Sequence, residues 1–126
     1  MRSIALMRRA YQLSGWGLVL LGTVHMATTF RAFDALSGAA VWFFGSGVAM
    51  ALTGVLNLLN DAYGGVANGI RWTCVGTNVA MTAFAVAAGV ASRAPVGQFV
   101  IVLGLVAGAA VLSAMRRPMA APVSRT

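Results

Sequence analysis

The chain has 126 residues, of which 60% are hydrophobic and 9% are charged. Soluble domains place charge on about a quarter of their residues, so this composition excludes a soluble globular protein. A disordered chain is excluded as well, because disordered segments are poor in apolar residues. The composition is that of a protein embedded in a lipid bilayer.

The charged side chains are nine arginines and two aspartates, with no lysine and no glutamate. They divide the chain into four uncharged runs of 21 to 26 residues: 10–30, 35–60, 72–92 and 94–115. A helix needs about 20 apolar residues to cross the hydrocarbon of a bilayer, and backbone groups in lipid must form hydrogen bonds within their own segment. We therefore predict an all-α fold in which residues 1–126 form one integral membrane domain, an antiparallel bundle of four transmembrane helices near 11–30, 39–59, 71–91 and 96–114.

The arginines also predict how the bundle is oriented. With a cytoplasmic N-terminus, the inner segments carry seven arginines and the outer segments carry two, Arg31 and Arg93. Cytoplasmic segments of membrane proteins are enriched in basic residues, so we expect both termini in the cytoplasm. The first apolar run follows a basic start, but it is longer than the core of a signal peptide and is expected to remain as the first helix.

The same arginines argue against nucleic acid as a partner. They lie in five separate segments, with no basic helix and no aromatic residues interleaved among them, whereas nucleic-acid-binding domains gather basic residues on one face. The partner that the charge pattern indicates is the lipid bilayer, whose anionic headgroups attract basic chain ends.

His25 is the single histidine and lies within the first predicted helix. It shares a helical face with Gly15, Gly22 and Thr29, and small residues allow a neighbouring helix to approach closely. We therefore predict that the imidazole points into the bundle. An ionisable residue inside a membrane is a candidate for function; the alternative is that His25 bonds to a neighbouring helix and only fixes the packing.

The second predicted helix carries a continuous polar stripe that includes Ser46, Thr53 and Asn57. Asn78 on the third helix lies at a depth similar to that of Asn57, so the two amides are predicted to meet. One interpretation is a polar pocket open toward one leaflet, and the other is a set of interhelical hydrogen bonds worth about 0.6 kcal/mol each. The candidate ligand-binding residues are the polar side chains of these faces: His25, Thr29, Ser46, Thr53, Asn57 and Asn78.

Other patterns concern packing and the membrane interface. Gly47 and Gly54 belong to a small-residue face of the second helix, and Gly104 and Gly108 form a GxxxG pair in the fourth. Both patterns favour close helix packing, within the chain or, for the GxxxG pair, between copies. Tryptophans and tyrosines anchor helices at the bilayer surface, and those of this chain lie near the predicted span ends: Tyr11, Trp16, Trp42, Tyr63 and Trp72.

The inventory of side chains argues against most kinds of catalysis. A zinc or iron site needs several His, Cys or carboxylate ligands, but the chain has one His, one Cys and two aspartates, both expected in loops. No pair of carboxylates is expected inside the membrane for acid–base chemistry, and a Ser–His pair would lack the acidic residue that orients the histidine. We predict a protein with no metal site, no cofactor and no enzymatic activity.

Two stretches of the sequence resemble small bacterial membrane proteins. They are Gly22-Thr23-Val24-His25 in the first predicted helix, and Trp42-Phe43 followed by Gly47, Gly54 and Asn57 in the second. On these residues the chain resembles the DoxX-like family and related small inner-membrane families, over residues 10–115. The resemblance implies a four-helix bundle in the bacterial inner (cytoplasmic) membrane, in some members accessory to a quinone-linked oxidoreductase, and it carries over no catalytic residue.

Two functions are compatible with these observations. The first is an accessory or structural subunit that acts through helix–helix contacts, in a homo-oligomer or a larger membrane complex. The missing catalytic groups and the small-residue faces favour it. The alternative is a binding or transport module for a lipophilic small molecule, a quinone or a lipid, that uses the polar face around His25.

Overall fold

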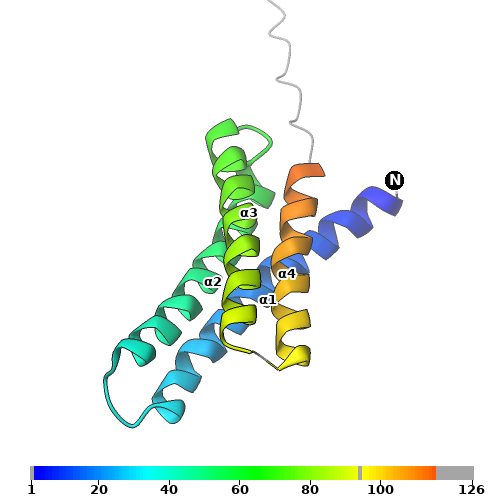
Figure 1. The fold of residues 1–126 in the computed structure, drawn as a ribbon. Coiled ribbons are helices and arrows are strands. Elements are labelled where there is room, and N and C mark those ends of the chain that lie inside the picture. The colour runs from blue at the N-terminus through cyan, green and yellow to red at the C-terminus, as the bar shows by residue number, and fades with distance from the viewer. Residues whose placement is uncertain (1, 94, 116–126) are drawn as a thin grey trace, which may run out of the picture.

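The computed structural model describes residues 2–93 and 95–115, and all regular structure in this part of the chain is helical. Four helices follow one another: α1 (Arg2–Ala32), α2 (Gly38–Tyr63), α3 (Asn68–Ala91) and α4 (Val96–Met115). They run up and down in turn as an antiparallel bundle (Figure 1). All four are long and apolar enough to cross a membrane, which confirms the predicted fold class and indicates a multi-pass membrane protein.

The helices extend beyond the ranges predicted from the uncharged runs. α1 begins at Arg2 instead of residue 11, because residues 2–10 are mostly good helix formers with no glycine or proline. α2 continues to Tyr63 instead of residue 59 and therefore includes Asp61. The expectation that both aspartates lie in loops is thus wrong for Asp61. α3 begins three residues earlier than predicted, at Asn68, and α4 ends one residue later, at Met115.

Local sequence accounts for the helix ends at the α1–α2 loop (33–37) and at the turn before α4. Ser37 caps α2, since its Oγ accepts a hydrogen bond from the Ala40 N–H at 3.2 Å, as N-cap serines commonly do. Arg93 has a φ of 50°, the left-handed backbone conformation found in tight turns. Pro95 follows and directly precedes α4, where its fixed φ suits the start of a helix. Both connections are short, so each joins two neighbouring antiparallel helices.

Glycines bring the backbones of α1 and α2 into direct contact. A Cβ atom at Gly22 would lie 2.5 Å from the Gly47 carbonyl oxygen, and one at Gly54 would lie 2.5 Å from the Gly15 carbonyl oxygen. The two contacts are seven residues apart on each helix, so they form a single antiparallel seam, which we name the glycine seam. The small-residue faces predicted on these two helices are confirmed as packing surfaces.

The GxxxG pair of α4 is not used in this way. Cβ atoms at Gly104 and Gly108 would meet nothing within 4 Å outside their own helix, in the described part of the chain. α4 packs through another face, on which Val106 and Ala109 form a small apolar core with Leu18 of α1. Packing of the GxxxG pair within the chain is therefore wrong as a prediction, and packing between copies stays a prediction.

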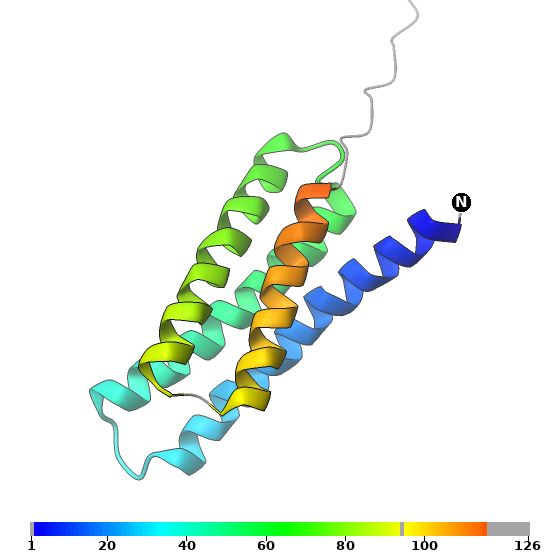
Figure 2. The ribbon, with the colours of Figure 1, turned by 45° about the vertical axis from the view of Figure 1, so that its right-hand side comes forward.

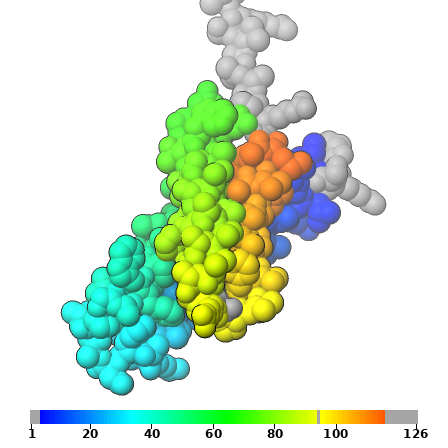
Figure 3. Space-filling model, viewed as in Figure 1, coloured from blue at the N-terminus to red at the C-terminus, as the bar shows by residue number. Residues whose placement is uncertain are grey.

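The two hairpins diverge at one end of the molecule. α3 and α4 stand next to each other, while the α1–α2 hairpin leans away from them toward its own loop (Figure 1). The space-filling view shows this loop end as a separate lobe (Figure 3). After a turn of 45°, the first turns of α1 also stand apart from the other helices (Figure 2). The bundle is thus tightest within the α1–α2 hairpin and most open where the two hairpins separate.

We expect Gly22→Ala to destabilise the protein, because its Cβ would overlap backbone atoms of Gly47 and Ala51. The matched control is Gly76→Ala on α3, which gains the same helix propensity, about 1 kcal/mol, but places its Cβ in open space. The two variants should differ by about 1–3 kcal/mol, the usual cost of overpacking. Thermal unfolding in detergent measures the difference. Equal midpoint temperatures for the two variants would contradict the close backbone contact at the glycine seam.

Candidate functional site

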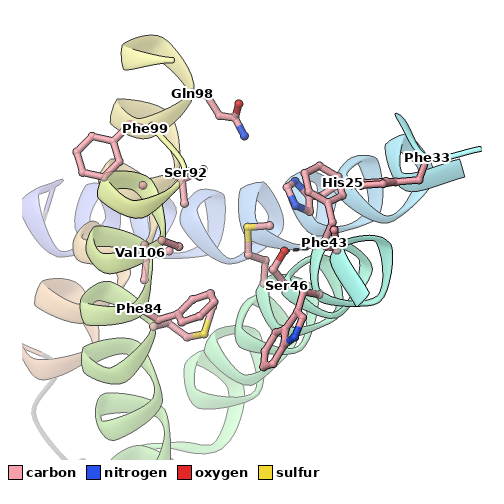
Figure 4. Close-up of a pocket in the computed structure, with 17 residues that line it drawn as sticks. His25, Phe33, Phe43, Ser46, Phe84, Ser92, Gln98, Phe99 and Val106 are labelled. Atoms are coloured by element: carbon pink, nitrogen blue, oxygen red, sulfur yellow. Dashed lines mark hydrogen bonds between the residues drawn. The ribbon is translucent and has the colours of Figure 1, made fainter. Parts of the chain in front are cut away.

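A pocket opens between the two hairpins at the end where they diverge. Its volume is about 470 Å³, within the range of small-molecule sites. All four helices contribute to its lining, with His25 from α1, Ser46 from α2, Phe84 from α3 and Gln98 from α4 among them (Figure 4). The lining is mainly apolar and aromatic, and it contains no arginine and no aspartate.

The pocket is polar at its mouth and apolar at depth. Ser92 directly follows α3 and Gln98 lies in the first turn of α4, so both are at the loop end, where they are exposed. Met81 and Val106 each lie ten residues from the same ends of their helices, which corresponds to about 15 Å along a helix. Val106 is fully buried. The pocket therefore suits a molecule with a polar head and an apolar body.

His25 lies in the pocket wall, as the predicted inward orientation requires. Its ring stacks on Phe43 of α2, with ring centroids 3.8 Å apart and planes inclined by 22°, and Phe43 packs in turn on Phe33. Such aromatic packing holds a ring in one orientation. Within residues 2–93 and 95–115, no group forms a hydrogen bond with the imidazole nitrogens, so the structure does not support the alternative in which His25 bonds to a neighbouring helix.

Ser46 is the second predicted residue in the pocket wall. Its hydroxyl donates a hydrogen bond to the Phe43 carbonyl oxygen at 2.7 Å. A serine hydroxyl has one proton and two acceptor lone pairs. Ser46 can therefore accept a hydrogen bond from a bound molecule, while its own proton is already used.

The two predicted threonines do not line this pocket. Both are buried, and both donate to a carbonyl oxygen of their own helix, Thr29 to His25 at 3.2 Å and Thr53 to Ala49 at 2.7 Å. This is the usual local bond of a helical threonine. Thr29 lines a second hollow, of about 680 Å³, beneath the α1–α2 loop. The two hydroxyl protons are therefore not available to a molecule in the first pocket.

Asn57 and Asn78 form a reciprocal amide pair farther from the pocket mouth. Each amide donates to the oxygen of the other, at 2.8 Å and 2.9 Å. Asn57 Nδ2 also donates to the Thr53 carbonyl oxygen at 2.8 Å, and Asn78 Nδ2 lies 3.1 Å from Ser113 Oγ of α4. Both side chains are almost fully buried. The predicted meeting of the two amides is confirmed, and their hydrogen bonds are made within the chain.

Asn60, which continues the polar stripe of α2, extends this pair to α1 together with Cys74 and Tyr11. Tyr11 Oη accepts a hydrogen bond from Asn60 Nδ2 at 2.8 Å and lies 3.4 Å from Cys74 Sγ, which in turn lies 3.4 Å from Asn57 Oδ1. Tyr11 is 1% exposed, so its predicted role as an interface anchor is wrong. We name these connected side chains the polar network: Tyr11, Asn57, Asn60, Cys74, Asn78 and Ser113.

The carboxylate of Asp61 lies next to the polar network, in the last turn of α2. Asp61 Oδ2 accepts a hydrogen bond from Gln12 Nε2 at 2.8 Å and pairs with Arg8 Nε at 3.3 Å. The Asp61 side chain is 6% exposed and that of Arg8 is 59% exposed. The early start of α1 adds Arg8 to Gln12 within reach of Asp61, and with both partners this carboxylate can be buried within a helix. Among the described residues no three His, Cys, Asp or Glu side chains come together to hold a metal ion.

Sequence reasoning also missed much of the pocket lining, including Gln98, and missed Ser113 of the polar network. Gln98 is the single amide in the run 94–115, and Ser113 is the single hydroxyl in that run. A lone polar residue in an apolar span was the available signal for both, because such residues usually face the protein interior. The phenylalanines of the pocket gave no such signal, since aromatic residues are equally suited to lipid.

A double-mutant cycle should show that Asn57 and Asn78 are coupled. Each single change to alanine leaves the other amide buried without its partner, which costs about 1–3 kcal/mol, so the double variant should lose less than the sum. Known couplings between membrane helices reach about 1.7 kcal/mol. Asn68, exposed at the start of α3, supplies the control cycle with Asn78. Unfolding in detergent measures the free energy of unfolding for both cycles. If the losses for Asn57 and Asn78 simply add, the two amides are not coupled and the prediction is wrong.

The comparisons with known proteins leave the chain without an assigned family. No family model, no curated protein and no solved structure matches it. The chemistry of the pocket and of the polar network therefore follows from the residues that form them.

Proposed function

We propose that the protein binds a lipophilic small molecule, a quinone or another lipid, in the pocket between the hairpins. The observation that carries this proposal is His25, held against Phe43 in an apolar pocket with no hydrogen-bond partner among the described residues. A polar group in an apolar environment is costly unless it is hydrogen-bonded. A bound molecule with a polar head would supply that bond.

The same surroundings favour binding over catalysis. A histidine that acts as a base is normally oriented by a carboxylate. The two carboxylates of this chain are elsewhere, since Asp34 is exposed in the α1–α2 loop and Asp61 pairs with Arg8 at the far end of α2. His25 is therefore proposed as a hydrogen-bonding residue of a binding site.

We further propose that the protein lies in the bacterial inner membrane with both termini in the cytoplasm. The distribution of arginines supports this orientation, and the resemblance to DoxX-like proteins supports the membrane. The α1–α2 loop, and with it the mouth of the pocket, would then face the outer side. A ligand would enter from the outer leaflet or from the outer aqueous phase.

A role as an accessory subunit is the second candidate. It is favoured by the GxxxG face of α4, on which Gly104 and Gly108 meet no other helix of the described chain. Glycine faces of membrane helices commonly pack against another helix. This role does not conflict with ligand binding, because the α4 glycines do not line the pocket.

We expect Ala85→Phe to reduce the amount of lipid that co-purifies with the protein, because Ala85 lines the pocket and a phenyl ring there would occupy it. The matched control is Ala87→Phe, which adds the same ring on an exposed face of α3. Native mass spectrometry of protein extracted with its lipids measures occupancy, and we expect a fall of about tenfold or more. The same spectra report the oligomeric state and any bound protein.

Equal occupancy in the Ala85→Phe and Ala87→Phe variants would overturn the pocket as the binding site. A partner-free monomer that retains no lipid would count against both candidate functions. Thermal unfolding of the two variants shows whether a loss of lipid reflects a loss of fold.

The proposed orientation predicts which loops a membrane-impermeant thiol reagent reaches. Leu36 in the α1–α2 loop is 90% exposed, and Val66 in the α2–α3 loop is 78% exposed. Leu36→Cys should be labelled on intact cells, and Val66→Cys only after the membrane is disrupted. The wild-type chain is the control, because Cys74 is buried. The reverse labelling pattern would show that the orientation is inverted.

A further inference from the structure

We infer that the pocket selects an uncharged amphiphile, whose hydroxyl or carbonyl head is held between His25 and Gln98. This inference rests on the proposed binding function and adds the chemical class of the ligand. It follows from three properties of the pocket: the charge of its lining, the hydrogen-bonding groups at its mouth, and the shape of its apolar part.

The lining offers no counter-ion. None of its residues is an arginine or an aspartate. Asp34 and Arg93 each directly follow a lining residue in the sequence, but both are exposed in loops and are opposite in sign. A phosphate, carboxylate or ammonium group taken into the pocket would lose water without gaining a partner, which is strongly unfavourable. A charged head is therefore disfavoured.

The polar groups of the pocket match a neutral head instead. His25 and Gln98 belong to different hairpins and extend toward the same space from opposite sides (Figure 4). A neutral imidazole offers one donor and one acceptor, and the glutamine amide offers both as well. Neither side chain forms a hydrogen bond with another described residue. A hydroxyl both donates and accepts, so it can bond to His25 and Gln98 together, whereas a plain hydrocarbon can bond to neither.

The deeper part of the pocket suits an apolar chain. Met50, Met81, Phe84 and Val106 line it from three different helices. Methionine side chains are flexible and fill irregular spaces, so two of them can adapt to a chain of varying shape. The distance from the mouth to Val106, about 15 Å along α4, is half of the hydrocarbon thickness of a bilayer. The ligand would lie with its head at one membrane surface and its chain within one leaflet.

Two lipids that share one chain provide the test. Monooleoylglycerol and monooleoyl lysophosphatidic acid differ by a phosphate group, so a comparison of the two isolates the effect of charge. Each is titrated into the delipidated full-length protein in detergent, and native mass spectrometry measures the bound fraction. We expect the uncharged lipid to bind about tenfold or more tightly than the phosphorylated one.

Variants that keep the bulk of the side chain test the head-group contacts. His25→Phe and Gln98→Leu should each weaken binding of monooleoylglycerol about three- to tenfold, the loss of one hydrogen bond. Thr28→Val is the control, since Thr28 is exposed on α1 and its hydroxyl bonds to the Val24 carbonyl oxygen. Since His25 and Gln98 form no hydrogen bond with described residues, the unfolding temperatures of these variants should stay close to that of the wild type.

The outcomes separate this inference from the proposed function. Equal or tighter binding of the phosphorylated lipid would overturn the inference, and a loss of that binding in Arg93→Gln would identify the loop arginine as its cause. A third outcome is that neither lipid binds, while the Ala85→Phe variant still co-purifies with less lipid than the Ala87→Phe variant. In that case the head-group inference is wrong and the proposed binding function stands. If the Ala85→Phe variant also retains its lipid, both are wrong.

Discussion

The close approach of α1 and α2 is the contact on which the rest of the structure depends. At Gly22 and Gly54 each helix backbone lies where a side chain would otherwise be, so these two helices behave as one packed unit. Membrane helices gain little from burying apolar side chains against each other, because lipid is equally apolar, and they depend on close packing and polar contacts. The glycine seam fixes the direction of the α1–α2 hairpin. That direction takes its loop end away from the α3–α4 hairpin, and the pocket lies in the space between the two hairpins.

The polar side chains of the bundle fall into two groups, which differ in whether they have hydrogen-bond partners within the described chain. In the polar network, amides, a phenol, a thiol and a hydroxyl from all four helices bond to one another and are almost completely buried. Such networks are rigid when every member is paired, so this part of the bundle holds the hairpins together. In the pocket, His25 and Gln98 have no such partners among the described residues. The contrast between paired and unpaired polar groups, more than the presence of polar groups, distinguishes the proposed binding site from the core.

The placement of charge follows from the same physics. The described arginines and aspartates lie in loops or within about two turns of a helix end, and Asp61 is buried only where Arg8 and Gln12 reach it. An unpaired charge deeper in the bundle would be costly. The pocket extends into the apolar region with a lining that carries neither arginine nor aspartate, and this is the physical basis of the proposal that its ligand is uncharged. The apolar spans and the uncharged pocket are therefore consequences of one constraint on charge.

The sequence by itself determined the number of helices, their apolar nature, the facing of Asn57 and Asn78, and the packing faces at Gly22 and Gly54. These features depend on the spacing of residues along each helix and on their distance from its ends, which the sequence contains directly. It did not determine that α1 begins at Arg2, that Asp61 is buried, or that Tyr11 belongs to the core, because each of these depends on a contact with another helix. The six candidate ligand-binding residues were predicted on the polar faces of three helices, yet only His25 and Ser46 line the pocket. Only the tertiary structure decided this division, because the angle between the hairpins sets which polar groups meet a partner and which face open space.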